Sequence, residues 1–183
     1  MGGRDKALMT LAGEPLLAHA VARLAPQVAS LALSANGDAS RFARFDLPVL
    51  ADNALDQGPL AGILAGLDWA AAQGAEHLVT VAVDTPFFPC DLVPRLLLAA
   101  EIGGAAAAIA ESHGRAHPTF ALWPVGAASA VREALGQGER KLMVQEALTT
   151  AARATWDDIL DPFFNINTEA DLATAKVYLK DSA

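Results

Sequence analysis

The 183-residue sequence is poor in cysteine and in positive charge. Its single cysteine, Cys90, cannot form an internal disulfide, and no Cys/His spacing resembles a zinc site. Thirteen Lys and Arg stand against 21 Asp and Glu, and this net charge of −8 argues against general affinity for nucleic acid or an anionic membrane surface. We therefore expect a protein of a reducing cytosol that is stabilised by its own apolar core.

Long hydrophobic runs are also missing. A membrane-spanning helix needs roughly 18 or more apolar residues, whereas the run over 78–83 ends at Asp84 and the Ala-rich stretch after Glu101 contains two glycines. The charged and polar opening does not resemble a signal peptide. We expect a cytoplasmic protein without membrane contact, folded as one domain over residues 1–183.

The order of apolar patterns predicts an α/β fold. Short Val- and Leu-rich runs alternate with segments of helical period, which is typical of a mostly parallel sheet covered by helices. The run 77–83 is expected to be a central strand, buried on both faces. Other strands are expected over 31–35 and 49–51, with a hairpin from 105–110 and 119–123. Helices are expected over 15–24, 60–73, 92–100, 126–135 and 142–150, with a last one capped by Thr168.

Polar residues gather where the predicted strands end. Ligands of open α/β sheets bind beyond the carboxyl ends of the strands, so these residues are candidate site residues. Asp84 directly follows the longest strand and could hold Mg²⁺ through a carboxylate oxygen, although Asp before Thr-Pro is also a common turn residue. The others are Ser34, Asn36, Asp52, Thr85, Asn165 and Asn167.

Candidate anion-binding groups lie on glycine-rich segments. Lys6 follows Gly2-Gly3, a combination that can cradle phosphate, although a lysine near a terminus is often only solvated. The segment 58–62 could let a ligand approach closely or simply start a helix. Arg140 and Lys141 stand at a predicted helix start, where cations are unfavourable unless an anion binds nearby, or form a solvated turn. His117, before a proline, fits a structural role better than a catalytic one.

Six segments, taken in order, resemble the molybdenum cofactor guanylyltransferases (the MobA family). The resemblance covers essentially the whole chain, and three segments, Gly-Pro-Leu-Ala-Gly, His-Pro-Thr and Asn-x-Asn-Thr, favour this family over other nucleotidyltransferases of the same fold. The segments lie at residues 1–6, at Asp52 with 58–62, and at 84–86, 117–119, 138–140 and 165–168.

The resemblance implies a three-layer, Rossmann-like nucleotidyltransferase fold with a small antiparallel element. It also implies that the terminal phosphate of molybdopterin attacks the α-phosphorus of GTP, which transfers GMP and releases pyrophosphate. Mg²⁺ would be the cofactor, and GTP and molybdopterin the partners. We expect a monomer and leave open a transient contact with molybdoenzymes or their chaperones.

The resemblance assigns roles residue by residue. Lys6 and Asp84 would be catalytic, with Lys6 on the triphosphate and Asp84 as the Mg²⁺ ligand. The nucleotide site would consist of Lys6, Ser34, Asn36, Asp52, Gly58, Pro59, Leu60, Gly62 and Asp84. The pterin-carrying substrate would meet Arg140, Lys141, Asn165 and Asn167.

Two departures from the family pattern keep alternatives open. Family members place a strand and a Leu-Ala-Gly-Gly loop before the Gly-Gly-x-Asp-Lys segment with which this sequence opens, and Ser34 stands where the family often has Asn. We therefore expect a domain shortened at its N-terminal side. A cytidylyltransferase, a sugar-phosphate nucleotidyltransferase, a catalytically weakened nucleotide-binding homologue, and a longer cellular protein with an earlier start codon are the alternatives.

Overall fold

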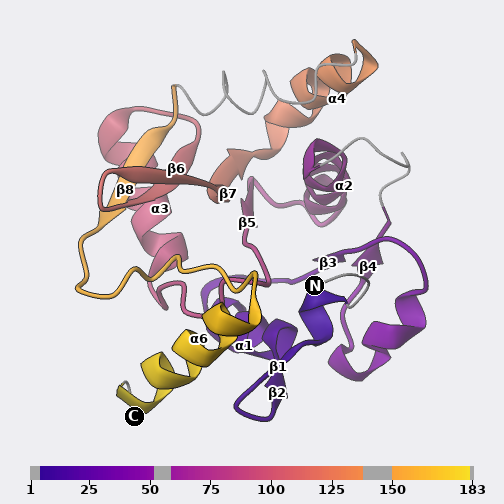
Figure 1. Ribbon diagram of the computed structural model, residues 1–183. Helices are drawn as coiled ribbons and strands as arrows, with labels where there is room; N and C mark the ends of the chain where they lie inside the picture. Colours follow the sequence, from indigo (N-terminus) through magenta and orange to yellow (C-terminus); the bar gives the residue numbers. More distant parts are fainter. Residues whose placement is uncertain (1–4, 52–58, 138–149, 182–183) are drawn as a thin grey trace.

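The computed structural model describes residues 5–51, 59–137 and 150–181, with side chains as far as residue 179. Its centre is a four-stranded sheet in the order β5-β7-β6-β8 (Figure 1). The strands are β5 (His77–Thr80), β6 (Ala108–Ser112), β7 (Arg115–Pro124) and β8 (Ala152–Trp156). Strand β7 is antiparallel to both of its neighbours, and β6 and β8 are parallel. The expected α/β class is confirmed, but the sheet is mixed rather than mostly parallel.

Helices pack against both faces of this sheet, which gives three layers. Ala108, Ala110 and Phe120 pack with α1 (Leu16–Leu24) and α3 (Leu92–Gly103). Ile109 and Trp123 point the other way and pack with α2 (Pro59–Ala72) and α4 (Ala128–Gly136). Successive residues of a strand face opposite sides, so the apolar run of β6 suits a strand buried between two helical layers.

The predicted hairpin is confirmed, with a first strand that begins and ends later than expected and a second strand that is longer than expected. Ser112 pairs with Arg115 across a two-residue turn in which His113 and Gly114 have φ values of 49° and 71°. Two positive φ angles in succession match the right-handed twist of the flanking strands, so this tight turn forces β6 and β7 to be antiparallel. This hairpin is the reason that the sheet is mixed.

The predicted helices have close counterparts among the described residues. Thr168 caps α6 (Glu169–Asp181) by accepting a hydrogen bond from the Asp171 N–H through its hydroxyl at 3.1 Å. The expected helix 126–135 begins with a 3₁₀ turn, η4 (Val125–Ala127), before α4. The helix expected over 142–150 lies almost wholly outside the described residues.

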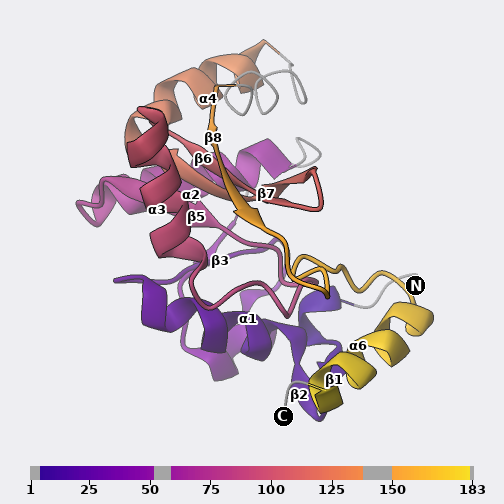
Figure 2. The ribbon, with the colours of Figure 1, turned by 90° about the vertical axis from the view of Figure 1, so that its left-hand side faces the viewer.

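Smaller elements lie on the N-terminal side of the fold. The strands β3 (Leu33–Ser34) and β4 (Val49–Leu50) form a separate parallel pair, and β1 (Thr10–Leu11) pairs with β2 (Glu14–Pro15). Figures 1 and 2 both place α6 beside β1 and β2. Three 3₁₀ helices complete this side: η1 (Lys6–Leu8), η2 (Ala25–Gln27) and η3 (Ala39–Phe45).

An apolar slot of about 400 Å³ separates β3 from β5. It is lined by Val21 and Leu24 of α1, Leu33 of β3, and Leu78 with Val81 on the β5 side. Gly66 of α2 also lines it, and a Cβ there would stand 3.0 Å from the Leu78 side chain. We name this space the strand slot, because strands border it on both sides.

The strand slot overturns one sequence expectation. Strand β5 ends at Thr80 rather than Val83, and residues 78–83 are half-buried instead of buried on both faces. The physical reason is that only β7 pairs with β5 among the described strands, so the other edge of β5 faces the slot. The expectation of a fully central strand was wrong for this structure.

Strand β8 has no counterpart among the strands expected from the sequence. Ala152, Ala154 and Trp156 alternate with the exposed Arg153 and Thr155, a period-2 signal of a half-buried strand. Phe163 and Phe164 lie in an irregular segment. No helix in the described residues is long and apolar enough to cross a membrane.

Candidate active site

The Lys6 side chain joins two distant parts of the chain at the rim of the sheet. Its Nζ donates to the Asp84 carboxylate Oδ2 at 3.0 Å and to the Asn167 side-chain Oδ1 at 2.6 Å. Lys6 opens η1, whereas Asp84 follows β5 by four residues. The structure therefore brings three of the predicted site residues into direct contact, and we name Lys6, Asp84 and Asn167 the rim cluster.

The rim cluster is accessible to a ligand. The side chain of Lys6 is 42% exposed and that of Asp84 is 20% exposed. An ion pair that remains in contact with water contributes little net stability, because water competes for both charges. The ammonium can therefore leave Asp84 for an incoming phosphate at low cost.

The segment 161–167, which we name the strap, carries both predicted asparagines to the rim. The Thr85 hydroxyl, fully buried, donates to the side-chain oxygen of Asn165. The backbone N–H of Ile166 donates to the Asp84 carbonyl at 2.7 Å. Ile166 itself is completely buried against Leu11 and Leu16. The strap is thus fastened at Asp84 of the rim cluster and at the neighbouring Thr85, and Asn165 and Asn167 remain exposed.

The start of α6 holds the end of the strap in place. The Asp171 carboxylate accepts the backbone N–H groups of Asn167 and Thr168 at 2.9 and 2.8 Å. These hydrogen bonds, with that of the Thr168 side chain, lower the pKa of Asp171 below its ordinary value. The exposed N–H groups at the helix start are satisfied in this way, which is the usual function of acidic residues in a first turn.

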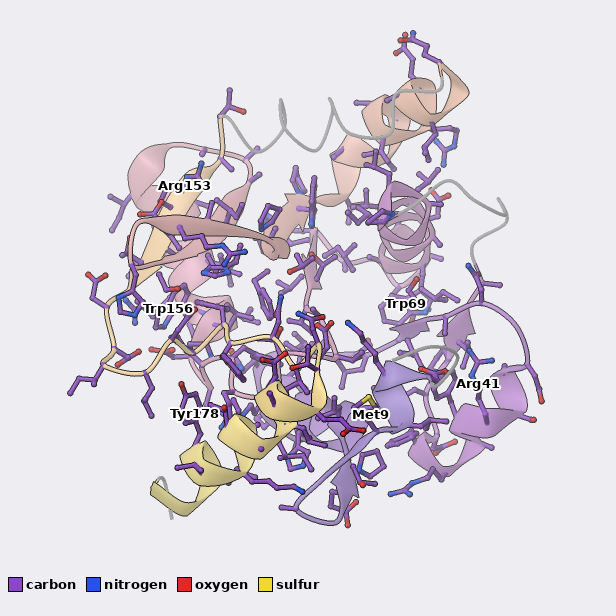
Figure 3. The ribbon with its side chains drawn as sticks, in the orientation of Figure 1. Met9, Arg41, Trp69, Arg153, Trp156 and Tyr178 are labelled. Atoms are coloured by element: carbon purple, nitrogen blue, oxygen red, sulfur yellow. The ribbon has the colours of Figure 1, made fainter. Side chains whose placement is uncertain are left out.

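A second set of contacts supports the loop that carries Lys6. Asp5 caps η1 by accepting the Ala7 N–H at 3.1 Å, and its other oxygen accepts Arg41 Nε at 2.8 Å. Arg41, labelled on η3 in Figure 3, also donates to the backbone carbonyl of Asn36 at 2.6 Å. Asn36, expected in the nucleotide site, is thereby linked through Arg41 to the residue that precedes Lys6.

The remaining predicted nucleotide residues are more dispersed. Ser34 is exposed at the end of β3 and borders the strand slot together with Gly62. Pro59 is exposed at the start of α2, whereas the side chain of Leu60 is 1% exposed and packs in the core beside Trp123. Leu60 can therefore border a ligand only through its backbone. Asp52, Gly58, Arg140 and Lys141 lie outside the described residues.

A buried polar network stands at the other end of the strap. The Ser112 hydroxyl donates to Asp161 Oδ1 at 2.7 Å and lies 2.8 Å from His117 Nε2. Ser112 and His117 are 1% and 8% exposed. Burial lowers the pKa of His117, although the nearby Asp161 charge acts in the opposite direction. The sequence reading found His117 but missed Ser112 and Asp161. The inward position of Ser112 after Ala108 and Ala110 was the available signal.

The rim cluster offers oxygen donors that suit a hard cation. No group of three or more His, Cys, Asp or Glu side chains is placed to hold a metal among the residues that the structure describes. Mg²⁺ does not need such a group, because one or two carboxylates together with substrate phosphates and water complete its shell. Asp84 Oδ2 and Asn167 Oδ1 already share one cation, the Lys6 ammonium, so these two oxygens are suitable ligands for Mg²⁺.

The fold and the family are those of nucleotidyltransferases. The structure superposes on 2-C-methyl-D-erythritol 4-phosphate cytidylyltransferase from Thermus thermophilus with a TM-score of 0.66, 20% identity and coverage of 96% of this chain and 94% of that one. The family model of the MobA-like NTP transferase domain matches residues 1–151. The chain belongs to the MobA-like NTP transferases.

Relatives within the family carry a more particular name. A molybdenum cofactor guanylyltransferase of Cereibacter sphaeroides is 52% identical over 183 residues, covering 100% of this chain and 92% of the relative. One from Acidiphilium cryptum is 49% identical over 178 residues, covering 96% and 87%. Molybdopterin-guanine dinucleotide biosynthesis protein A of Archaeoglobus fulgidus shares the fold, with a TM-score of 0.74, 24% identity and coverage of 98% and 92%.

Proposed function

We propose that this protein transfers GMP from GTP to molybdenum-bound molybdopterin and so forms the guanine dinucleotide cofactor. The observation that carries the proposal is the rim cluster, in which Lys6 stands between Asp84 and Asn167. Relatives at about half identity, named molybdenum cofactor guanylyltransferases, supply the choice of substrates.

The proposed reaction is a single displacement at phosphorus. An oxygen of the molybdopterin phosphate attacks the α-phosphorus of GTP, the bond to the β-phosphate oxygen breaks, and pyrophosphate leaves. Such transfers depend mainly on positioning the reactants and neutralising their charge. Lys6 would neutralise the triphosphate. Asn165 and Asn167 would orient the pterin-carrying substrate, since both are exposed and Asn167 contacts Lys6.

The proposed cofactor is Mg²⁺, and Asp84 is the residue that would hold it. When bound, the ion supplies positive charge for the phosphate oxygens. Asp84 is suited to this because its backbone is fixed by the hydrogen bond from Ile166 and its carboxylate is still reachable from water. Lys6 would then turn from Asp84 toward the triphosphate.

The remaining residue assignments stay predictions. The nucleoside would lie near Ser34, Asn36, Asp52 and the start of α2 at 58–62, and Arg140 with Lys141 would bind phosphate of the second substrate. We also retain the cytoplasm as the location, since the single cysteine is free and exposed, which agrees with a reducing compartment. The monomeric state and the transient contact with molybdoenzymes remain predictions as well.

Labelled nucleotide transfer tests the proposed function directly. Purified protein is incubated with molybdopterin, Mg²⁺ and GTP labelled at the α-phosphate, and label in the pterin product is measured with pyrophosphate release. The expected result is transfer from GTP and little from CTP. Transfer from CTP alone would assign the cytidylyl reaction, and transfer only to sugar phosphates would overturn the choice of acceptor.

We further propose that an added parallel strand completes the sheet in the strand slot. The slot is apolar, its two bordering strands belong to separate sheets, and Lys6 contacts Asp84 just beyond the carboxyl end of β5. The strand that the family pattern places before the Gly-Gly-x-Asp-Lys segment would run along the slot and end at the rim.

The added strand can be tested, and the same test decides whether the 183-residue chain is fully active or is a catalytically weakened nucleotide-binding homologue. The coding DNA upstream of Met1 is read for an in-frame apolar strand with a glycine-rich loop, and the longer protein is compared with the 183-residue chain. We expect the longer form to melt higher and turn over faster. Equal affinity for Mg-GTP and molybdopterin, equal turnover and equal melting in both forms would contradict the added strand.

A further inference from the structure

The network of Ser112, His117 and Asp161, which we name the latch, joins the β6–β7 hairpin to the strap. Ser112 has one O–H, and the Asp161 carboxylate receives it at 2.7 Å. The 2.8 Å contact between Ser112 Oγ and His117 Nε2 is therefore made by an N–H of the ring, which donates to the hydroxyl oxygen. The result is a directed chain of hydrogen bonds from His117 through Ser112 to Asp161.

Asp161 also makes hydrogen bonds within the strap. Its Oδ1 also accepts the backbone N–H of Phe163 at 3.0 Å, and its carbonyl accepts that of Phe164 at 3.2 Å. The ring of Phe163 stacks on His117 with 4.5 Å between the centroids and 27° between the planes. One carboxylate and one ring thus hold the first turn of the strap against the hairpin.

The strap has two fixed ends and a short span between them. At one end, Asp161 belongs to both the latch and the strap. At the other end, Asn165 and Asn167 contact Thr85 and Lys6. Between them Phe163 and Ile166 are buried, at 3% and 0% exposure. A shift of the latched end must therefore appear at the two exposed asparagines, because the buried side chains leave the strap little freedom to absorb it.

Stability alone does not explain the latch. A buried polar group costs free energy unless all of its hydrogen bonds are made, and apolar residues of similar volume often stabilise a core equally well. A serine, a histidine and an aspartate at this position instead specify one location for the strap. The strap leads directly to the rim cluster.

We propose that Ser112, His117 and Asp161 are positioning residues that set where Asn165 and Asn167 meet the second substrate. The substrate assignment rests on the proposed function, whereas the mechanical link between latch and strap does not. The latch acts on the acceptor side of the reaction, because the strap carries the two asparagines proposed to meet the pterin-carrying substrate. Lys6 lies on η1, which the Asp5 cap and the Asp5–Arg41 contact hold independently of the strap.

Ser112→Ala is the disrupting variant, and the chain offers matched controls. Asp161→Asn keeps an oxygen acceptor for the Ser112 hydroxyl and the Phe163 N–H, so this variant should behave much like the wild type. Thr80→Val removes a hydroxyl from the same sheet, one that accepts Trp123 Nε1 at 3.1 Å, without touching the strap. Asp161 is half-buried, so Asp161→Ala tests the same link if Ser112→Ala does not fold.

Two measurements decide the proposal. In Ser112→Ala the KM for molybdopterin should rise roughly tenfold, as expected for one lost hydrogen bond to a charged group, with the KM for GTP changed less than about twofold. Exchange of the Phe163 and Ile166 amide hydrogens should become faster. Thr80→Val should leave both quantities at their wild-type values.

The outcomes separate the proposal from the function on which it rests. Wild-type exchange in the strap of Ser112→Ala, or equal changes in Ser112→Ala and Thr80→Val, would overturn the positioning role. Faster exchange with an unchanged KM for molybdopterin would overturn it too. A wild-type protein that transfers no GMP would refute the proposed function, and the exchange measurement would still decide whether the latch holds the strap.

Discussion

The rim cluster and the latch are two polar sites at opposite ends of one strap, and they differ in their access to water. Lys6 is 42% exposed, whereas Ser112 is 1% exposed. An exposed charge can exchange its partner for a ligand, whereas a buried hydrogen bond is costly to break and so fixes geometry. Polar side chains therefore serve recognition at the exposed end of the strap and positioning at the buried end.

Replacing Asp84 by alanine should have the largest effect, and it should change the rim cluster without disturbing the latch. The variant removes the proposed Mg²⁺ ligand and an ion pair with Lys6 that stays in contact with water, so we expect GMP transfer to fall by about a thousandfold with the melting temperature nearly unchanged. Initial rates over a Mg²⁺ series measure this effect. Glu101→Ala removes an exposed carboxylate on α3 and serves as the control. Wild-type turnover in Asp84→Ala would refute the metal assignment.

Lys6→Ala should give the next largest effect, on binding rather than on the fold. Loss of one charge-assisted contact to the triphosphate should weaken Mg-GTP affinity by roughly 10- to 100-fold. Calorimetric titration with Mg-GTP measures it, and Lys176→Ala on the exposed face of α6 is the matched control. Unchanged affinity for Mg-GTP in Lys6→Ala would mean that the ammonium pairs with Asp84 but does not bind the triphosphate.

Acid should act on the latch through His117. Burial lowers the pKa of His117 below its ordinary value of 6.5, with Asp161 and Glu111 opposing and Arg115 assisting. Below that pH the unfolded chain binds a proton that the folded protein resists, so the unfolding free energy should decrease until the folded pKa is passed.

His117→Gln tests the acid effect, because an amide can donate to Ser112 without titrating. Denaturant unfolding between about pH 5 and 7 should give a flatter pH dependence for this variant than for the wild type. Parallel curves for the two proteins would show that His117 does not contribute to the acid sensitivity.

An exposed ion pair far from both sites should matter least. Arg132 Nη2 lies 2.7 and 2.9 Å from the two carboxylate oxygens of Asp68, but the side chains are 55% and 52% exposed. Arg132→Ala should change the unfolding free energy by less than about 1 kcal/mol and leave GMP transfer unchanged. A larger loss in denaturant unfolding would show that good geometry outweighs exposure at this pair.

Local signals made much of the fold predictable from sequence. The helical period of 60–73, the turn residues His113-Gly114 and the Thr168 cap each act over a few residues, and each has its counterpart in the structure. The edge position of β5 was not predictable in this way, since it depends on which strand lies beside it. Apolar runs alone do not specify their neighbours.

The candidate site was predictable in its residue types and less so in its contacts. Asp84 and Lys6 stood out because a carboxylate after a strand and a lysine after glycines carry local signals. The latch did not stand out, because Ser112 and Asp161 are 49 residues apart and become partners only through the pairing of β6 with β7 and β8. Long-range pairing of polar residues leaves no periodic trace in a sequence.

The division of the sheet at the strand slot has a consequence for how the molecule opens. Backbone hydrogen bonds tie β5, β6, β7 and β8 together, whereas β3 and β4 form their own pair and are joined to the rest through packed side chains. Regions held by fewer backbone hydrogen bonds open at lower free energy, as partly independent folding units. Native-state proteolysis should therefore begin in the β3–β4 half, and a ligand that spans the rim would protect it by joining the two units.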